Sequence, residues 1–204
     1  MQRVYRAENG CEELILFEPI EELSMLKKSL LLLTLCLLLN FQPSYAAKSK
    51  PTQPEPQIEV YFSPNGGCTD AIVKTLGQAK STLLIQAYSF TSAPIAKAVV
   101  DAHKRGVQVN VILDKSQRTE KYSSADFIAH AGIKVQIDDK HKIAHNKIMI
   151  IDSNTVITGS FNFTKAAEEG NAENLLIIQS ADLAAKYIEN WKKHAEHSEA
   201  YEGK

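Results

Sequence analysis

Short aliphatic and β-branched runs alternate with helix-like segments from Ile58 onward, and this alternation restricts the fold more than any other feature of the sequence. Strand-like runs stand at 58–62, 82–90 and 107–113, and helix-like segments at 69–79 and 93–105. Strands that alternate with helices form βαβ units, whose helices cover the faces of a sheet. We therefore expect an α/β fold with a mixed, mostly parallel β-sheet flanked by helices on both faces.

The pattern changes in the second half of the chain. A helix is expected at 123–131, a strand at 133–137 and a polar loop at 138–142. Two strand-like runs then follow, 145–151 and 155–158, separated only by Asp152-Ser153-Asn154, which is the spacing of a β-hairpin. A short helix at 165–169, a strand at 174–178 and a helix at 181–197 complete the expected elements.

A basic and then apolar segment precedes this region. Lys27 and Lys28 are followed by an apolar run at 30–39 and by Ser44-Tyr45-Ala46. This order is typical of a secretory signal peptide, and the run is shorter than the roughly 20 apolar residues that span a bilayer. We expect a signal peptide at 25–46 and export to the periplasm or the medium, with an uncleaved anchor as the alternative. Because such a signal opens a chain, we expect Met25 to be the true start and 1–24 a spurious extension.

The rest of the chain is expected to form one domain. Prolines among polar residues predict a linker at 47–57, followed by the domain at 58–198 and a tail at 199–204. A net charge of −1 and a hydrophobic fraction of 44% are typical of a soluble globular protein and indicate no partner. Only Cys68 follows the expected cleavage site, so we expect no disulfide within the mature chain and a buried thiol, with pairing between two chains as the alternative.

The hairpin gathers four polar side chains at one end. Residues two apart in a strand share a face, so His145 and Lys147 project together. A turn centred near Ser153 places residue i opposite about 306 − i by the rule of antiparallel pairing, which brings Ser160 and Asn162 beside them. We expect His145 and Lys147 at a solvent-accessible strand end.

This set of groups suits phosphoryl chemistry. An imidazole acts as a nucleophile or acid near neutral pH, while ammonium, hydroxyl and amide groups bind phosphoryl oxygens. Glu173 is expected to orient the imidazole by accepting its second ring proton. Asp152 opens the turn, where a hydrogen bond to the turn backbone is expected rather than proton transfer. The alternative is that His145 and Lys147 are merely solvated polar residues.

The segment His145-Asn146-Lys147 through Asp152 resembles the H-x-K-x-x-x-x-D motif of the phospholipase D superfamily, and 159–164 resembles its G-S-x-N segment. The likeness extends over much of 60–191 and includes 62–64, 88–90 and 165–168. In these details the chain is similar to the small, single-motif bacterial endonucleases of the superfamily. The resemblance implies a phospholipase D-like α/β/α sandwich.

The same resemblance implies a role for each site residue. His145 would attack phosphorus and form a phosphohistidine, Lys147, Ser160 and Asn162 would hold phosphoryl oxygens, and Glu173 would support His145. Family members use two copies of the motif, whereas this chain has one. A homodimer with a shared active site would supply a second His145 as general acid.

No metal and no other cofactor are expected. The remaining histidines lack zinc-type spacing, and His194 and His197, three apart on the last helix, are interpreted as an exposed helical face. Asn65-Gly66-Gly67 is interpreted as a strand-to-helix turn rather than a phosphate loop. Residues 140–142 add positive charge ahead of His145, either as a guide for a polyanion or as a plain solvated loop.

The sequence thus predicts an exported phosphodiesterase, most simply a nuclease acting on DNA or RNA. One alternative is a phospholipase D that releases the headgroup of phosphatidylcholine-type lipids. Another is a phosphate-binding module without catalysis. The partner in each case carries phosphate: a nucleic acid or a phospholipid.

Overall fold

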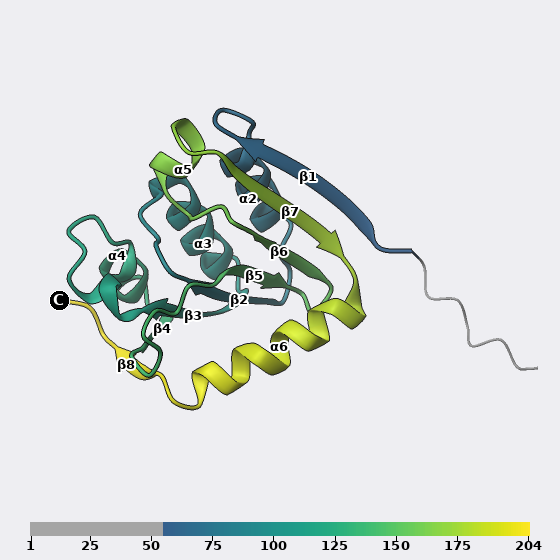
Figure 1. The fold of residues 1–204 in the computed structure, drawn as a ribbon. Coiled ribbons are helices and arrows are strands. Elements are labelled where there is room, and N and C mark those ends of the chain that lie inside the picture. The colour runs from purple at the N-terminus through teal and green to yellow at the C-terminus, as the bar shows by residue number, and fades with distance from the viewer. Residues whose placement is uncertain (1–54) are drawn as a thin grey trace, which may run out of the picture. The chain divides into compact units, whose positions relative to one another are not determined.

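The computed structural model describes residues 55–204, which form an eight-stranded sheet with helices on both faces (Figure 1). The strands lie in the order β1-β7-β6-β5-β2-β3-β4-β8. Their bounds are β1 Gln57–Ser63, β2 Thr82–Ala87, β3 Gln108–Asp114, β4 Lys134–Asp138, β5 Lys147–Ile151, β6 Thr155–Gly159, β7 Glu173–Gln179 and β8 Glu199–Tyr201. The expected signal peptide, the expected extension at 1–24 and most of the expected linker lie outside the described residues.

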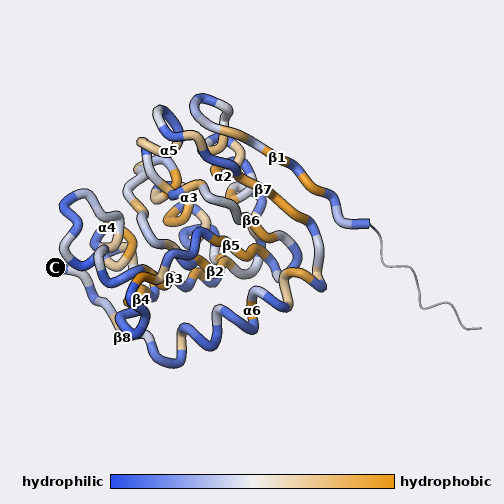
Figure 2. Tube along the Cα trace, in the orientation of Figure 1, coloured by the Kyte–Doolittle hydropathy of each residue, from blue (hydrophilic) through white to orange (hydrophobic). Residues whose placement is uncertain are grey.

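The helices divide between the two faces of the sheet. They are α2 Cys68–Gly77, α3 Ala93–Lys104, α4 Ala125–His130, α5 Lys165–Glu169 and α6 Ala181–Ala195, with a 3-10 turn, η1, at Lys115–Arg118. The larger core lies between the sheet and α2, α3 and α4, and a smaller one lies under α6. Figure 2 shows hydrophobic residues concentrated in the strands, while α6 is hydrophilic over most of its length.

Helix α6 is capped at its start and joined to the sheet near its end. Ser180 caps its first turn by accepting a hydrogen bond from the backbone N–H of Leu183, at 3.2 Å. Near the other end, the buried Trp191 donates from Nε1 to the carbonyl oxygen of Ile85 in β2, at 2.9 Å. A buried indole N–H needs such a partner, so this bond sets where α6 crosses the sheet.

The α/β fold with a mixed sheet and helices on both faces is confirmed, with two corrections. The sheet is not mostly parallel: within 55–204 only β2–β3 and β3–β4 pair in parallel, and the other five pairs are antiparallel. Hairpins and returning strands supply those pairs, and they need no crossover helix. The residues expected as a tail at 199–204 include β8, which pairs with β4 at one edge of the sheet.

Two smaller points concern single features. Cys68 is a buried free thiol, as expected, and burial raises its pKa to about 11. Within the described part of the chain, no helix has the length and apolar content needed to cross a bilayer.

The hairpin has the predicted register. Met149 pairs with Ile157, Ile150 with Val156 and Ile151 with Thr155. On its other side β5 pairs with β2, from Lys147 opposite Ala87 to Ile151 opposite Leu83. The strand is therefore held on both sides, and its five residues are all buried.

Asp152 lies at the turn end of β5. We expected its carboxylate to bind the backbone of the turn itself, but it binds a different segment. Its carboxylate accepts hydrogen bonds from the backbone N–H groups of Lys80, Ser81 and Thr82 and from the hydroxyl of Ser81, at 2.8–3.3 Å. Asp152 and Ser153 both have positive φ, 52° and 54°. The side chain thus joins the hairpin turn to the segment that leads into β2.

We predict that Asp152→Asn lowers the free energy of unfolding by about 1–2 kcal/mol at neutral pH, because it removes the charge that four donors share while asparagine still tolerates positive φ. Burial raises the pKa of Asp152, but the bonds from residues 80–82 outweigh it and hold the pKa below its usual range. Urea unfolding at pH 7 measures the difference.

The pH dependence checks the cause. Because the pKa is lower in the folded chain, the contribution of the carboxylate is complete above the unfolded pKa of about 4 and disappears as the pH falls through the folded pKa. The gap between wild type and Asp152→Asn should therefore narrow below about pH 4. A gap that stays constant down to pH 2.5 would contradict this assignment.

Candidate active site

The loop between β4 and β5 carries His145 to one end of the central strands, and two hydrogen bonds with residues at the ends of β2 and β3 fix this loop. The buried carboxylate of Asp114, at the end of β3, accepts from the backbone N–H of Ala144 at 2.7 Å. The backbone N–H of Tyr88, just after β2, donates to the carbonyl oxygen of Asn146 at 2.8 Å. The residues on both sides of His145 are thereby held.

His145 and Lys147 lie together but in different surroundings. The His145 side chain is exposed, and its ring packs 4.5 Å from the ring of Tyr88, centroid to centroid. Lys147 is only 7% exposed, and its Nζ donates to the carbonyl oxygen of His145 at 2.7 Å. The expected accessible strand end is thus correct for His145 and wrong for Lys147, whose side chain is buried where β5 pairs with Ala87 of β2.

Burial also changes the ammonium group electrostatically. Loss of solvent lowers the pKa of Lys147, and the nearby Glu173 carboxylate opposes that shift. The Nζ also lies 5.1 Å from the centre of the Tyr88 ring, a distance at which the ring face attracts a cation. Lys147 is therefore a partly desolvated cation whose position is linked to the backbone of His145.

Ser160 and Asn162 follow β6 along an unusual backbone. The N–H groups of Ser160 and Phe161 both donate to the carbonyl oxygen of Asn174, at 3.1 and 3.2 Å, and the Ser160 hydroxyl accepts from the N–H of Asn174. This closeness requires Gly159, whose φ is 142° and where a Cβ would lie 2.2 Å from the Asn174 carbonyl oxygen. The chain here adopts a bend that only glycine permits.

The Asn162 amide is left available. Its Oδ1 is buried and has no hydrogen-bond partner within 55–204. Because the two ends of an amide are assigned from their partners, this group is free to present either O or N to a ligand. An uncommitted buried amide is unusual and is consistent with a ligand site.

Glu173 and Asp152 differ from their expected contacts. Glu173 accepts from the Asn171 amide at 3.1 Å, and in the described residues no hydrogen bond joins it to His145. Support of His145 by Glu173 stays a prediction, while the electrostatic effect of Glu173 reaches Lys147. Asp152 lies at the opposite end of β5 from Lys147, which agrees with a structural role and not with proton transfer.

The glycine turn before α2 is not a phosphate loop. The Glu168 carboxylate accepts from the N–H groups of Gly67 and Thr69, at 3.1 and 2.7 Å. A carboxylate at a helix N-terminus occupies the donors that a phosphate would need. The strand-to-helix turn interpretation is confirmed.

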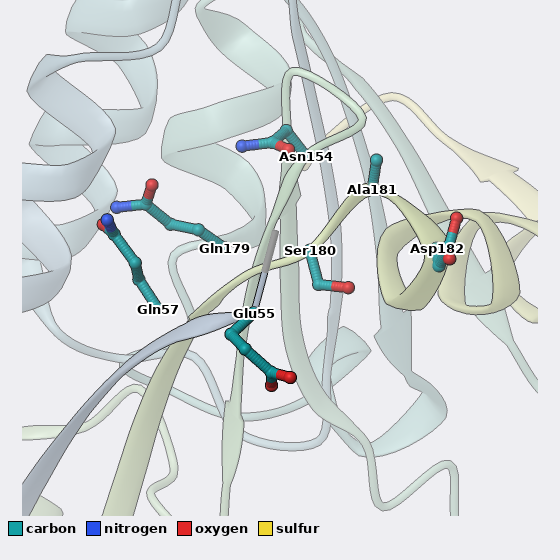
Figure 3. Close-up of a pocket in the computed structure, with 7 residues that line it drawn as sticks. All are labelled: Glu55, Gln57, Asn154, Gln179, Ser180, Ala181 and Asp182. Atoms are coloured by element: carbon teal, nitrogen blue, oxygen red, sulfur yellow. The ribbon is translucent and has the colours of Figure 1, made fainter. Parts of the chain in front are cut away.

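Figure 3 shows a polar hollow at the other end of the sheet, beside the hairpin turn and the start of α6. Its lining residues are Glu55, Gln57, Asn154, Gln179, Ser180, Ala181 and Asp182. This set includes two carboxylates and no cation or imidazole, so it would repel phosphate. The candidate site is therefore the open surface around His145, not this hollow.

Sequence reasoning gave no role to Asp114, and none to Tyr88 beyond its place in the likeness at 88–90. Both residues hold the loop that carries His145 through long-range contacts. It also misjudged His194 and His197: their side chains are 15% and 29% exposed and lie against the buried Asp138, so they do not form an exposed helical face. The last turn of α6 faces the sheet at that point. The prediction that catalysis needs no metal is not affected by this correction.

Comparison with known proteins gives a consistent result. Residues 72–195 match the family described as cardiolipin synthase, PLD-like domain. A protein named phospholipase D from Rickettsia bellii is 43% identical over 135 residues, which cover 66% of this chain and 67% of that protein. The mitochondrial cardiolipin hydrolase of Mus musculus is 32% identical over 122 residues, 60% of this chain and 55% of that protein.

A solved structure is similar to this chain in both fold and sequence. Nuc from Salmonella typhimurium, described as a phospholipase D family member, superposes with a TM-score of 0.70 and is 39% identical. The match covers 72% of this chain and 99% of that one. The likeness therefore extends over nearly the whole described domain.

We predict that Asp114→Ala loosens the loop at 139–146, because it removes the acceptor of the Ala144 N–H. Amide hydrogen exchange should be about ten-fold faster or more at Ala144. Asp126→Ala, which removes a carboxylate bonded to Tyr201 instead, is the control and should leave exchange in this loop unchanged. Unchanged exchange at Ala144 in Asp114→Ala would show that other contacts hold the loop.

Proposed function

The chain belongs to the phospholipase D superfamily of phosphodiesterases, and from this we propose that it cleaves the phosphodiester bonds of nucleic acids at His145 and Lys147. The observation that carries the proposal is that the exposed His145 imidazole stands beside the buried Lys147 ammonium, which donates a hydrogen bond to the backbone carbonyl oxygen of His145. The exposed imidazole is open to a substrate and stands beside a fixed positive charge, which supports a role as nucleophile. The similarity of the chain to a protein named as a hydrolase favours catalysis over a phosphate-binding module.

The proposed reaction has two steps. The His145 imidazole attacks phosphorus and forms a phosphohistidine while the leaving oxygen takes a proton from a general acid, and water then releases the phosphate group. Lys147, Ser160 and Asn162 bind the phosphoryl oxygens as their charge grows. Desolvation of Lys147 strengthens its attraction for that charge, since fewer waters compete.

Charge around the site supports a polyanion as substrate. Lys140 and Lys142 are exposed in the loop that leads to His145, and Lys115 lies against the same loop, donating to the carbonyl oxygen of His141 at 3.0 Å. Lys121 and the 70% exposed Tyr122 lie on the neighbouring segment after η1. Cations with an exposed aromatic ring suit a nucleic-acid strand, whose phosphates pair and whose bases stack.

A phospholipid is the second candidate. Ile143 is 51% exposed only two residues before His145, and an apolar side chain at that position suits contact with acyl chains or a membrane surface. The names of the relatives from Rickettsia bellii and Mus musculus also point to lipid substrates. Export through the predicted signal peptide is compatible with either substrate and stays part of the proposal.

We predict that His145→Ala and Lys147→Met each reduce hydrolysis by at least about 1,000-fold, since the first removes the nucleophile and the second the fixed charge. Lys147→Met keeps the apolar stem that fills a buried position. Release of product from DNA, RNA and phosphatidylcholine vesicles measures both the loss and the substrate class.

His130→Ala, at an exposed histidine on α4, is the matched control and should keep wild-type rates. Circular dichroism verifies that each variant is folded. Near wild-type hydrolysis by folded His145→Ala would reject the proposed mechanism. Cleavage of vesicles but of neither nucleic acid would keep the mechanism and replace the substrate.

We further propose a homodimer that brings two copies of His145 to one substrate. An exposed apolar stripe supports this: Ile58, Val60 and Phe62 alternate along the edge strand β1 and are 53%, 50% and 65% exposed. Ile58 pairs with Ile178 of β7, which pairs with Val156 of β6, so these side chains share one face of the sheet. Helix α6 covers that face at Val156, whereas the side chains of β1 on the same face are exposed. An uncovered apolar stripe on an edge strand favours contact with another chain.

We predict that Phe62→Glu turns a dimer into a monomer and lowers activity at least about ten-fold in dilute solution, because the charge breaks an apolar contact and separates the two His145 side chains. Sedimentation velocity and hydrolysis are measured on the same samples. Phe127→Glu, at a phenylalanine 52% exposed on α4, is the control and should stay dimeric. A wild-type protein that is fully active as a monomer would refute the shared site.

A further inference from the structure

Three histidines and one aspartate meet at the end of β4, apart from the residues assigned to phosphoryl transfer. Asp138 is the last residue of β4, and His141 follows in the next loop. His194 lies in the last turn of α6, and His197 comes two residues after that helix. One ligand atom from each of the four lies within 4.8 Å of all the others.

The distances within the cluster fit a shared ion. His141 Nδ1 and His194 Nδ1 lie 3.0 and 2.8 Å from Asp138 Oδ2, and His197 Nε2 lies 3.3 Å from Oδ1. Four ligands about 2.0–2.1 Å from a tetrahedral zinc ion stand roughly 3.3 Å from one another. The contacts to Asp138 are near that spacing, while the more widely spaced atoms of the cluster, all within 4.8 Å, would close on the ion. The three ring centroids are 4.8–5.5 Å apart, close enough for all three rings to face one centre.

Hydrogen bonds within the cluster do not satisfy the ligand atoms of all four side chains. The Nε2 atom of His197 is buried and has no hydrogen-bond partner in the described part of the chain, although it points at the Asp138 carboxylate. The Asp138 side chain is completely buried. A buried anion faced by three imidazole nitrogens is a donor set that a divalent transition metal prefers.

The segments that carry these residues are already joined. The Gln136 amide, in β4, donates to the carbonyl oxygens of Ala195 and Ser198 at 3.1 and 3.2 Å. The Ser198 hydroxyl donates to the carbonyl oxygen of His194 at 2.7 Å. These bonds fix the end of α6 against β4 without any ion. An ion would therefore enter a largely formed site, and the 47% exposed His141 leaves a path for entry.

We propose that Asp138, His141, His194 and His197 form a structural site for a zinc-like divalent transition metal. Three nitrogens and one oxygen suit Zn²⁺ or Co²⁺, whereas Mg²⁺ and Ca²⁺ require mainly oxygen ligands. Four protein ligands close a tetrahedral site and leave no open position for substrate. Bound metal joins the end of α6 to the loop that leads to His145, and it stabilises the fold.

The test uses purified protein stripped with chelator and then titrated with Co²⁺, whose tetrahedral complexes absorb visible light far more strongly than octahedral ones. We expect one Co²⁺ per chain with the intense tetrahedral spectrum, displaced by Zn²⁺. Zn²⁺ should also raise the melting temperature of the stripped wild type, since it binds only the folded chain.

Variants locate the ion. His197→Ala and His141→Ala should each weaken binding by at least about 100-fold and remove the rise in melting temperature. His141 is exposed in a loop, so that variant keeps its fold even where a change at α6 does not. His130→Ala is the control and should bind as wild type does. Absence of the tetrahedral spectrum in wild type, or equal binding by folded His141→Ala, would overturn the proposal.

Discussion

The double pairing of β5, between β2 and β6, is the constraint on which the rest of this structure depends. It buries all five residues of the strand and so fixes where the strand can begin and end. Lys147 enters the sheet as the first residue, and Asp152 leaves it as the turn begins. Both ladders therefore hold the turn end of β5 at Ile151, whereas Lys147 at the other end pairs with Ala87 of β2.

Sequence reasoning succeeded where local rules decide the outcome. A three-residue connection determines the hairpin register, and the observed pairing of Met149 with Ile157 follows from it. Strand direction farther along the sheet is not local: β1 and β7 pair in antiparallel fashion although even the pair nearest in sequence, Ser63 and Glu173, lies 110 positions apart. The brief segment at β8 has no strong pattern of its own and becomes a strand only because β4 offers an edge.

The same limit applies to the site. The candidate residues His145, Lys147, Ser160 and Asn162 belong to short motifs and could be singled out from the sequence, and their roles stay predictions. Tyr88 and Asp114 act through the tertiary fold, and no motif near them signals their contacts with the loop before β5. The pairs Asp138 with His141 and His194 with His197 each have ordinary helix-like spacing, but His194 and Asp138 stand 56 residues apart, so their meeting required the fold.

Gly159 illustrates how a residue without reactive atoms governs chemistry. A methyl group there would collide with the Asn174 carbonyl oxygen and push β6 away from β7. Ser160 and Asn162 stand directly downstream, so both would move with the displaced backbone. A loss of activity in Gly159→Ala would thus result from the steric clash of one methyl group. An assay that records turnover alone would not distinguish it from the loss of a reacting group.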